Sequence, residues 1–193
     1  MVFAFRPESR SSSTGFPTKA MELGQELILK APDIPDAPNY LMFDLEGLPP
    51  QYEESDKVYL WGMQVFGNKP TGFLAAVAGF GTDGDKQGWF DFLARAKQIF
   101  SDYGDIKFVH WADYEKTNVK RYIDRYGDPE GIAARVQANL LDLLDVAEES
   151  IVLPLPSYSL KVIEQHIGYK RTQEEYGGQW SMAQYIEAVD QEN

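Results

Sequence analysis

The clearest pattern of apolar and polar positions is YLMFDLEG, residues 40–47, an apolar run that ends in two acids. Residues 57–66 (KVYLWGMQVF) are also rich in β-branched and aromatic side chains, and residues 71–80 (TGFLAAVAGF) follow with a weaker version. Short apolar runs bounded by Pro- and Gly-containing segments predict three β-strands. The connections are too short for a crossover helix, so we expect an antiparallel meander.

Helical spacing replaces this pattern beyond residues 81–88 (GTDGDKQG), which we expect to be a loop. Apolar side chains then recur three and four positions apart in residues 89–104, up to a terminating glycine. Residues 105–111 (DIKFVHW) predict a fourth strand. Further helices are expected at residues 113–127, 130–151 (with an extended break near 140–142), 158–168 and 181–190. This order predicts the α/β class, a mixed sheet with helices packed on it.

The first part of the chain has a different composition. Residues 6–20 (RPESRSSSTGFPTKA) are rich in Ser, Pro and Gly, and residues 31–39 (APDIPDAPN) contain three prolines. Residues 21–30, between them, are compatible with a short amphipathic element. Such segments favour extended or mobile chain. We therefore predict a flexible lead-in over residues 1–37, followed by a single domain over residues 38–193.

Composition narrows the functional classes. The chain has 193 residues, 44% of them hydrophobic, which is enough for one sizeable core. A net charge of −12 argues against broad, sequence-independent coating of nucleic acid, because such binding needs Lys and Arg. The chain has no cysteine, which excludes disulfides and thiolate metal sites. With no apolar run long enough to span a bilayer and no signal-like N-terminus, we expect a cytoplasmic protein without membrane contact.

Two acids end the first predicted strand. Asp44 and Glu46 are two positions apart, so their side chains should share one face of the strand. Carboxylates so placed repel each other unless a cation lies between them. Oxygen ligands of this kind suit Mg²⁺ or Mn²⁺ rather than zinc. Alternatively, one acid faces solvent or caps the turn at Gly47, and the pair has no chemical role.

A second group of polar side chains lies where the fourth strand runs into a helix. Residues 108–122 (FVHWADYEKTNVKRY) carry His110, Asp113 and Glu115. A carboxylate at this end of a central strand could converge on the first two acids. The alternatives are that Asp113 is an N-cap, that Glu115 is a favourable charge in the first helical turn, and that His110 is a buried histidine bonded to backbone.

A third pair of acids, Asp142 and Asp145, occurs in NLLDLLDVAEES. Their spacing of three would place them on one face of a helix, where they could join a site or simply be solvated.

Taken together, these segments resemble a known family. FDLEG (43–47), VHWADYE (109–115), LLDLLDV (140–146) and YSLKVIEQHIGY (158–169) resemble the DEDD-type 3′–5′ exonucleases of the ribonuclease H-like superfamily. The chain is similar in particular to the YprB-like branch, whose members are often fused to RecB-type nuclease domains. The resemblance covers roughly residues 38–190 and implies a ribonuclease H-like fold.

The resemblance also implies roles for individual residues. Asp44 and Glu46 match the first motif, in which both acids are catalytic and bind metal. Glu115 matches the metal-binding acid of the second motif, where relatives often have Asp. His110, Asp113 and Asp142 would then have supporting roles. Trp111 and Tyr114 could stack on a terminal base, as could Trp61, although core packing is the commoner role of such aromatic residues.

The closing motif departs from the family pattern. Relatives place a Tyr or His a few residues before an Asp on a last helix, whereas here Tyr185 and Asp190 are five apart in a different setting. We therefore expect the domain to be incomplete at its C-terminal end, and the activity of this chain alone to be low.

The function implied is that of a metal-dependent nuclease. Two Mg²⁺ or Mn²⁺ ions would assist hydrolysis at the 3′ end of single-stranded DNA or RNA. A partner of the RecB nuclease or helicase type is expected from the fusions seen in relatives. The alternative is a non-catalytic module of the same fold, acting as an interaction or structural arm of a larger nuclease.

Overall fold

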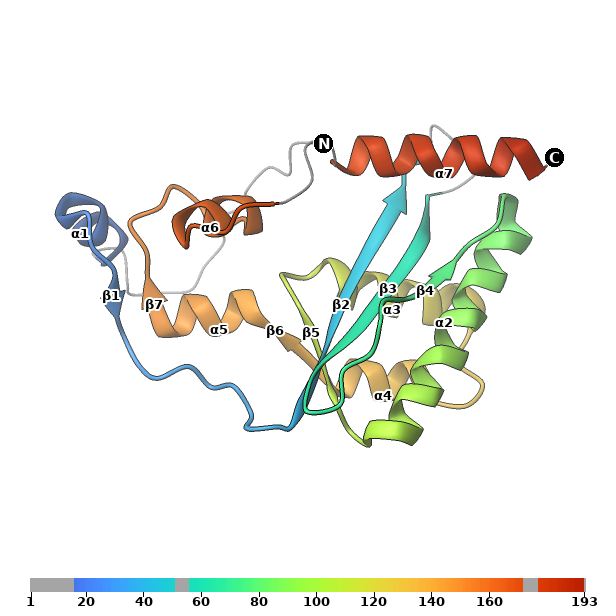
Figure 1. Ribbon diagram of the computed structural model, residues 1–193, viewed down its shortest axis with the longest axis horizontal. Helices are drawn as coiled ribbons and strands as arrows, with labels where there is room; N and C mark the ends of the chain where they lie inside the picture. The colour runs from blue at the N-terminus through green and yellow to red at the C-terminus, as the bar shows by residue number, and fades with distance from the viewer. Residues whose placement is uncertain (1–15, 51–55, 172–176, 193) are drawn as a thin grey trace.

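The computed structural model describes residues 16–50, 56–171 and 177–192. Its centre is a five-stranded sheet with the spatial order β4-β3-β2-β5-β6 (Figure 1). The strands are β2 (Asn39–Leu48), β3 (Lys57–Gly67), β4 (Leu74–Val77), β5 (Lys107–His110) and β6 (Leu140–Asp142). The predicted α/β class with a mixed sheet is confirmed.

The pairing of the strands sets which ends of the sheet carry which residues. Strands β2, β3 and β4 pair antiparallel in succession, which confirms the predicted meander. Strand β5 instead pairs parallel to β2, and β6 pairs parallel to β5. The carboxyl ends of β2, β5 and β6 therefore lie at one edge of the sheet. Both acids of the first motif and the segment after β5 are brought to this edge.

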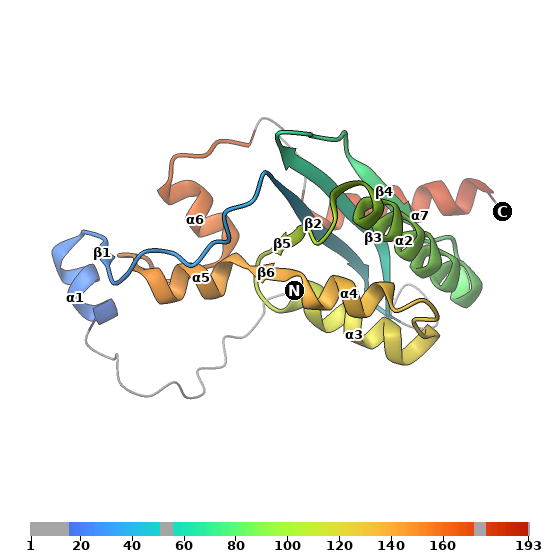
Figure 2. The same ribbon diagram turned by 90° about the horizontal axis from the view of Figure 1, so that it is seen from below.

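Three helices cover one face of the sheet: α2 (Gly81–Tyr103), α3 (Tyr114–Tyr126) and α4 (Ile132–Ala138) (Figure 2). Alternate residues of β2 and β3 point into the core that these helices bury, because side chains of a strand repeat every two positions. Trp61 is fully buried there and stacks on Phe92 with ring centroids 4.6 Å apart. Trp61 therefore packs in the core and does not offer a face to a base.

Helix α2 begins eight residues earlier than the pattern predicts, since residues 81–88 are helical and do not form a loop. Glycines there predict a break in the helix, but two of them instead allow close packing. A Cβ on Gly84 would lie 2.2 Å from the backbone of Gly79, and one on Gly88 would lie 2.8 Å from Ala78. The helix can lie against the end of β4 only because these positions lack side chains.

The chain after α3 alternates short helices and strands. The segment expected as helix 130–151 is divided into α4, β6 and α5 (Leu143–Ser150), so the predicted extended break is real. Helices α6 (Leu160–His166) and α7 (Gly178–Glu192) follow, the second longer than expected. None of the helices in the described residues is both long and apolar enough to cross a membrane.

Part of the expected lead-in has secondary structure. Helix α1 (Phe16–Leu23) precedes β1 (Leu27–Ile28), which pairs antiparallel with β7 (Ile151–Val152). An ion pair of 2.8 Å between Lys30 and Glu149 ties this segment to α5. Its partner strand is more than a hundred residues away, so local composition could not reveal the pairing; residues 1–15 lie outside the described part.

Helix α7 runs across the ends of β2 and β3 (Figure 1). It is held by a small second core in which Tyr185 stacks on Tyr59 at 4.6 Å, beside Leu48. The Tyr185 hydroxyl donates to the carbonyl of Gly79 at 3.1 Å, and that of Tyr59 donates to Ser181 at 2.7 Å. Tyr185, considered above for a closing motif, is thus a packing residue; the side chain of Asp190 lies outside the described ones.

Candidate metal-binding and catalytic site

The acids of β2 lie on the face opposite the main core. Leu41, Phe43 and Leu45 are buried under the helices, whereas Asp44 is exposed and Glu46 half-buried. The alternation therefore places both carboxylates on one face, as the sequence predicts. A register shift between Glu46 and Gly47 marks a β-bulge directly after the second acid.

These two carboxylates interact with each other and with a third. Asp44 is accessible to solvent, but the protein atoms around its carboxylate desolvate it enough to raise its pKa, and the charge of Glu115 raises the pKa further. Burial also raises the pKa of Glu46, with the charge of Asp44 as the second cause. Both shifts show that the ionised forms are disfavoured without a cation. Asp44 is the member of the group that interacts with both other acids.

Glu115 occupies the first turn of α3, directly beyond the end of β5. Only 4% of the residue is exposed. Its Oε2 is buried and has no hydrogen-bond partner within the described residues. The nearest cationic group is the imidazole of His110, whose Nδ1 lies 3.6 Å from that oxygen, too far for a hydrogen bond. A buried carboxylate oxygen without a hydrogen-bond donor destabilises the fold unless a ligand binds to it.

The turn between β5 and α3 is held in a strained conformation. Ala112 has a φ of 67°, which is uncommon for a residue with a side chain. Its N–H donates to Asp142 at 2.9 Å, and its carbonyl accepts from Nδ1 of His110 at 2.7 Å. Burial lowers the pKa of His110, but the neighbouring Glu115 and the Ala112 carbonyl raise it overall. His110 and Asp142 therefore shape the turn that presents Glu115.

Asp142 also serves as the N-cap of α5, because its Oδ1 accepts from the N–H of Leu144 at 2.8 Å. Asp142 thus precedes the helix that contains Asp145, an exposed residue, and the two acids do not form a joint helical face. The structure places Asp142 beside the site and leaves Asp145 outside it.

The remaining residues singled out in the sequence have separate positions. Asp113 is 82% exposed at its side chain and lies 3.9 Å from Lys116; it stands at the N-cap position without a capping hydrogen bond. Trp111 is half-buried, and its indole N–H donates to the carbonyl of Tyr158 at 3.0 Å. Tyr114 is 40% exposed. Of these side chains, only Tyr114 interacts with the site's acids, Glu46 and Glu115, through charge.

One cation near the site was not identified in the sequence. The charge of Arg171 lowers the pKa of Asp44, although less than burial and Glu115 raise it. Its guanidinium is held by Glu164 of α6, with Nε and Nη2 donating at 2.9 and 2.8 Å. Arg171 stands in a polar stretch without periodic pattern, so no signal in the sequence distinguishes it from other surface cations.

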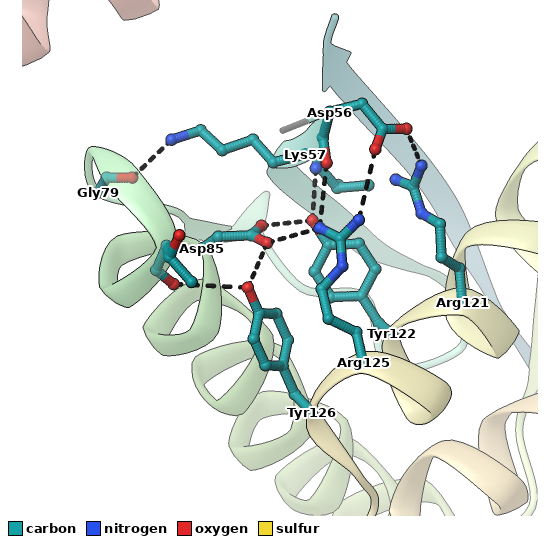
Figure 3. A network of polar contacts seen from close by, with 10 residues as sticks. Asp56, Lys57, Gly79, Asp85, Arg121, Tyr122, Arg125 and Tyr126 are labelled. Carbon is teal, nitrogen blue, oxygen red and sulfur yellow. Dashed lines mark hydrogen bonds and ion pairs between the residues drawn. The ribbon is translucent and has the colours of Figure 1, made fainter. Parts of the chain in front are cut away.

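Helix α3 is fixed to the fold by a buried polar network (Figure 3). Asp85 of α2, 1% exposed, accepts from Arg125 at 2.9 Å, from the Tyr126 hydroxyl at 2.7 Å and from the Tyr122 hydroxyl. The Tyr122 oxygen in turn accepts from the N–H of Val58 in β3 at 2.6 Å. These bonds join α3 to both α2 and the sheet, and so determine where its first turn lies.

The donor set fits a hard divalent cation by its chemistry. Asp44, Glu46 and Glu115 supply only oxygen, which Mg²⁺ and Mn²⁺ prefer. The unpaired Oε2 of Glu115 is a ready ligand atom. Over residues 16–50, 56–171 and 177–192, no three His, Asp or Glu side chains are already gathered closely enough to hold an ion. The three acids thus interact through their charges and lie at the same end of the sheet. Within the described residues they do not form a preassembled metal-binding site.

Comparison with known protein families gives a match over most of the chain. A family described as the RNase_H superfamily matches residues 41–192, which include every strand of the sheet except the first two residues of β2. No curated protein and no solved structure matches significantly.

Proposed function

Because the chain belongs to the RNase H superfamily, we propose that it is a metal-dependent nuclease domain that hydrolyses phosphodiester bonds at nucleic-acid 3′ ends. The observation that carries the proposal is Glu115, a buried carboxylate with an unpaired oxygen beside the acids of β2. If Glu115 had only a structural role, that oxygen would be expected to accept a hydrogen bond from a protein donor. The 3′ preference rests on the resemblance of the FDLEG, VHWADYE and YSLKVIE segments to DEDD-type exonucleases.

In this proposal Asp44, Glu46 and Glu115 hold Mg²⁺ or Mn²⁺. When bound, such ions activate water and stabilise charge on the leaving oxygen. Asp44 is the best candidate to contact two ions, because it interacts with both other carboxylates. Bound cations would also relieve the repulsion that raises the pKa of Asp44 and Glu46.

Other residues keep the acids in place. His110 and Asp142 bond the two polar atoms of the Ala112 peptide units and hold the turn before α3. Helix α3 is fixed at its far end by the Asp85 network. Position is the main contribution of a protein to phosphoryl chemistry of this kind, because misplacement of a reacting group by about 1 Å can cost on the order of a hundredfold in rate.

Two measurements on one set of variants test the proposal. Thermal unfolding with and without millimolar Mn²⁺ should show stabilisation, since a ligand at a hundred times its Kd adds about 2.7 kcal/mol. Incubation with 5′-labelled single-stranded DNA or RNA should shorten the strand from its 3′ end. Asp44→Asn and Glu115→Gln should remove both effects.

Asp113→Asn is the matched control, because it neutralises an exposed acid two residues from Glu115 that points to Lys116. It should behave as the unsubstituted protein. Equal Mn²⁺ stabilisation in Asp44→Asn and the unsubstituted chain would show that the ions bind elsewhere. Stabilisation without strand shortening would favour a non-catalytic module that retains the metal site.

A further inference from the structure

The hydroxyl of Tyr114 occupies a space that exists only because residue 47 is glycine. A Cβ built on Gly47 would lie 2.2 Å from the Tyr114 oxygen, far inside van der Waals contact. Gly47 does not have a left-handed backbone, so no conformational reason requires glycine there. The position directly follows the β-bulge beside Glu46. Close approach of the tyrosine hydroxyl to the strand therefore explains the glycine.

This hydroxyl lies among the acids of the proposed site. Tyr114 is close enough to Arg121, Glu46 and Glu115 to interact electrostatically with all three. The oxygen has no hydrogen-bond partner within the described residues, and 40% of the residue remains exposed. A protonated phenol in this place can donate a hydrogen bond to a ligand that arrives from solvent.

Several other donors near the acids are already engaged, whereas Arg121, which also interacts with Tyr114, pairs with Asp56 and keeps a buried Nε without a hydrogen-bond partner. Nδ1 of His110 donates to the Ala112 carbonyl, the indole of Trp111 to that of Tyr158, and the hydroxyl of Tyr59 to Ser181. Arg171 is held by Glu164 through two of its nitrogens. Carboxylates can only accept when ionised, whereas the oxygens of a phosphodiester need donors. Tyr114 has a hydroxyl without a hydrogen-bond partner among the described residues, and it can meet that need.

We propose that Tyr114 is a substrate-contacting residue whose hydroxyl donates a hydrogen bond to a phosphodiester oxygen of the bound strand, and that Gly47 is required to make room for it. This inference rests on the function proposed above. It assigns the hydroxyl a polar role in place of the base stacking that the sequence suggests. No bond is formed or broken by Tyr114, which keeps its proton throughout.

The test measures binding of a fluorescent single-stranded oligonucleotide by anisotropy, with Ca²⁺ as the oxygen-seeking cation. Tyr114→Phe should weaken binding about tenfold, as expected for a hydrogen bond to a charged group. Gly47→Ala should weaken it similarly, because the new methyl group displaces the hydroxyl. Once the hydroxyl is removed, the nearest ring atom to that methyl, Cζ, lies at 3.5 Å, an ordinary contact.

A double-mutant cycle separates this role from a general effect on the fold. Gly47→Ala should have almost no further effect in the Tyr114→Phe background. Tyr59→Phe is the matched control, since it removes a second hydroxyl that interacts with Glu46 but is bonded to Ser181. Its oligonucleotide affinity should be unchanged.

The outcomes distinguish the inference from the function on which it rests. If the unsubstituted protein does not bind the strand, the proposed function fails and the role of Tyr114 with it. If the protein binds and Tyr114→Phe binds equally well, the inference alone is wrong. Additive losses in the cycle would also overturn it, because they would show that Gly47 acts independently of the hydroxyl.

Discussion

Replacement of Asp85 by alanine should be among the most damaging single changes outside the candidate site. The carboxylate is 1% exposed and accepts from Arg125 and from two tyrosine hydroxyls (Figure 3). Its removal leaves two phenols without this acceptor and leaves the partly buried guanidinium of Arg125 with Asp56 as its remaining partner. Breaking a buried pair by deleting one partner costs about 3–5 kcal/mol. For a chain of this size, that corresponds to a fall in Tm of about 6–20 °C.

Urea unfolding followed by tryptophan fluorescence measures this loss, because Trp61 and Trp89 pack against Tyr122 in the same region. Asp83→Ala is the matched control on the same helix. Asp83 is exposed in the first turn of α2. Its replacement should therefore lower the free energy of unfolding by only about 0.3–1 kcal/mol, through the lost interaction with the helix dipole. A loss below about 1 kcal/mol for Asp85→Ala would refute the view that this network anchors α3.

The same network predicts a dependence on alkaline pH. Burial, followed by the hydrogen bond to Asp85, raises the pKa of Tyr126 from 10.0 to about 12. Between these values the folded protein keeps a proton that the unfolded chain has lost, so stability must fall as pH rises through the window. The contribution of Tyr126 to the free energy of unfolding should be constant below pH 10.0 and decline up to about pH 12. Tyr126→Phe should make the decline shallower.

Three further substitutions have expected effects on urea unfolding. Asp44→Asn should stabilise the metal-free protein at neutral pH, because the raised pKa of Asp44 shows that its ionised form is less favourable in the folded than in the unfolded protein. This gain should vanish below the ordinary pKa of 3.8, where Asp44 is protonated in both the folded and the unfolded protein. Ala112→Gly should raise stability by up to about 1 kcal/mol by relieving a φ of 67°. Gly88→Ala should lower it by about 1–3 kcal/mol, since its Cβ would lie 2.8 Å from Ala78. Opposite signs would contradict each argument.

The sheet was predictable because its strands carry their own patterns. Strand β2 alternates buried and exposed positions, and β3 is dense in aromatic and β-branched residues. The first two turns of α2 were missed because Gly81, Gly84 and Gly88 are breakers in any local reading. Two of these glycines allow contact between backbones, and that reason becomes visible only when the helix is placed against Gly79 and Ala78.

Part of the candidate site could likewise be predicted from local sequence, and part could not. Placing Asp44 and Glu46 on one face follows from strand geometry alone. The turn at Ala112 could not be predicted, because its two bonds come from His110 and from Asp142, which is 30 residues away. The nearness of Arg171 to Asp44 likewise depends on the path of the chain after α6, which no periodicity encodes.

Helix α3 connects the stability of the fold to the chemistry of the site. Its first turn carries Glu115, and its last turns carry Tyr122, Arg125 and Tyr126. A buried carboxylate without a hydrogen-bond partner is unfavourable, and a helix free to shift would turn it towards water. The bonds to Asp85 oppose such a shift at the far end of the helix, while the Ala112 turn opposes it at the near end. The polar network can therefore keep Glu115 buried at the position that the proposed metal site requires, without contacting it.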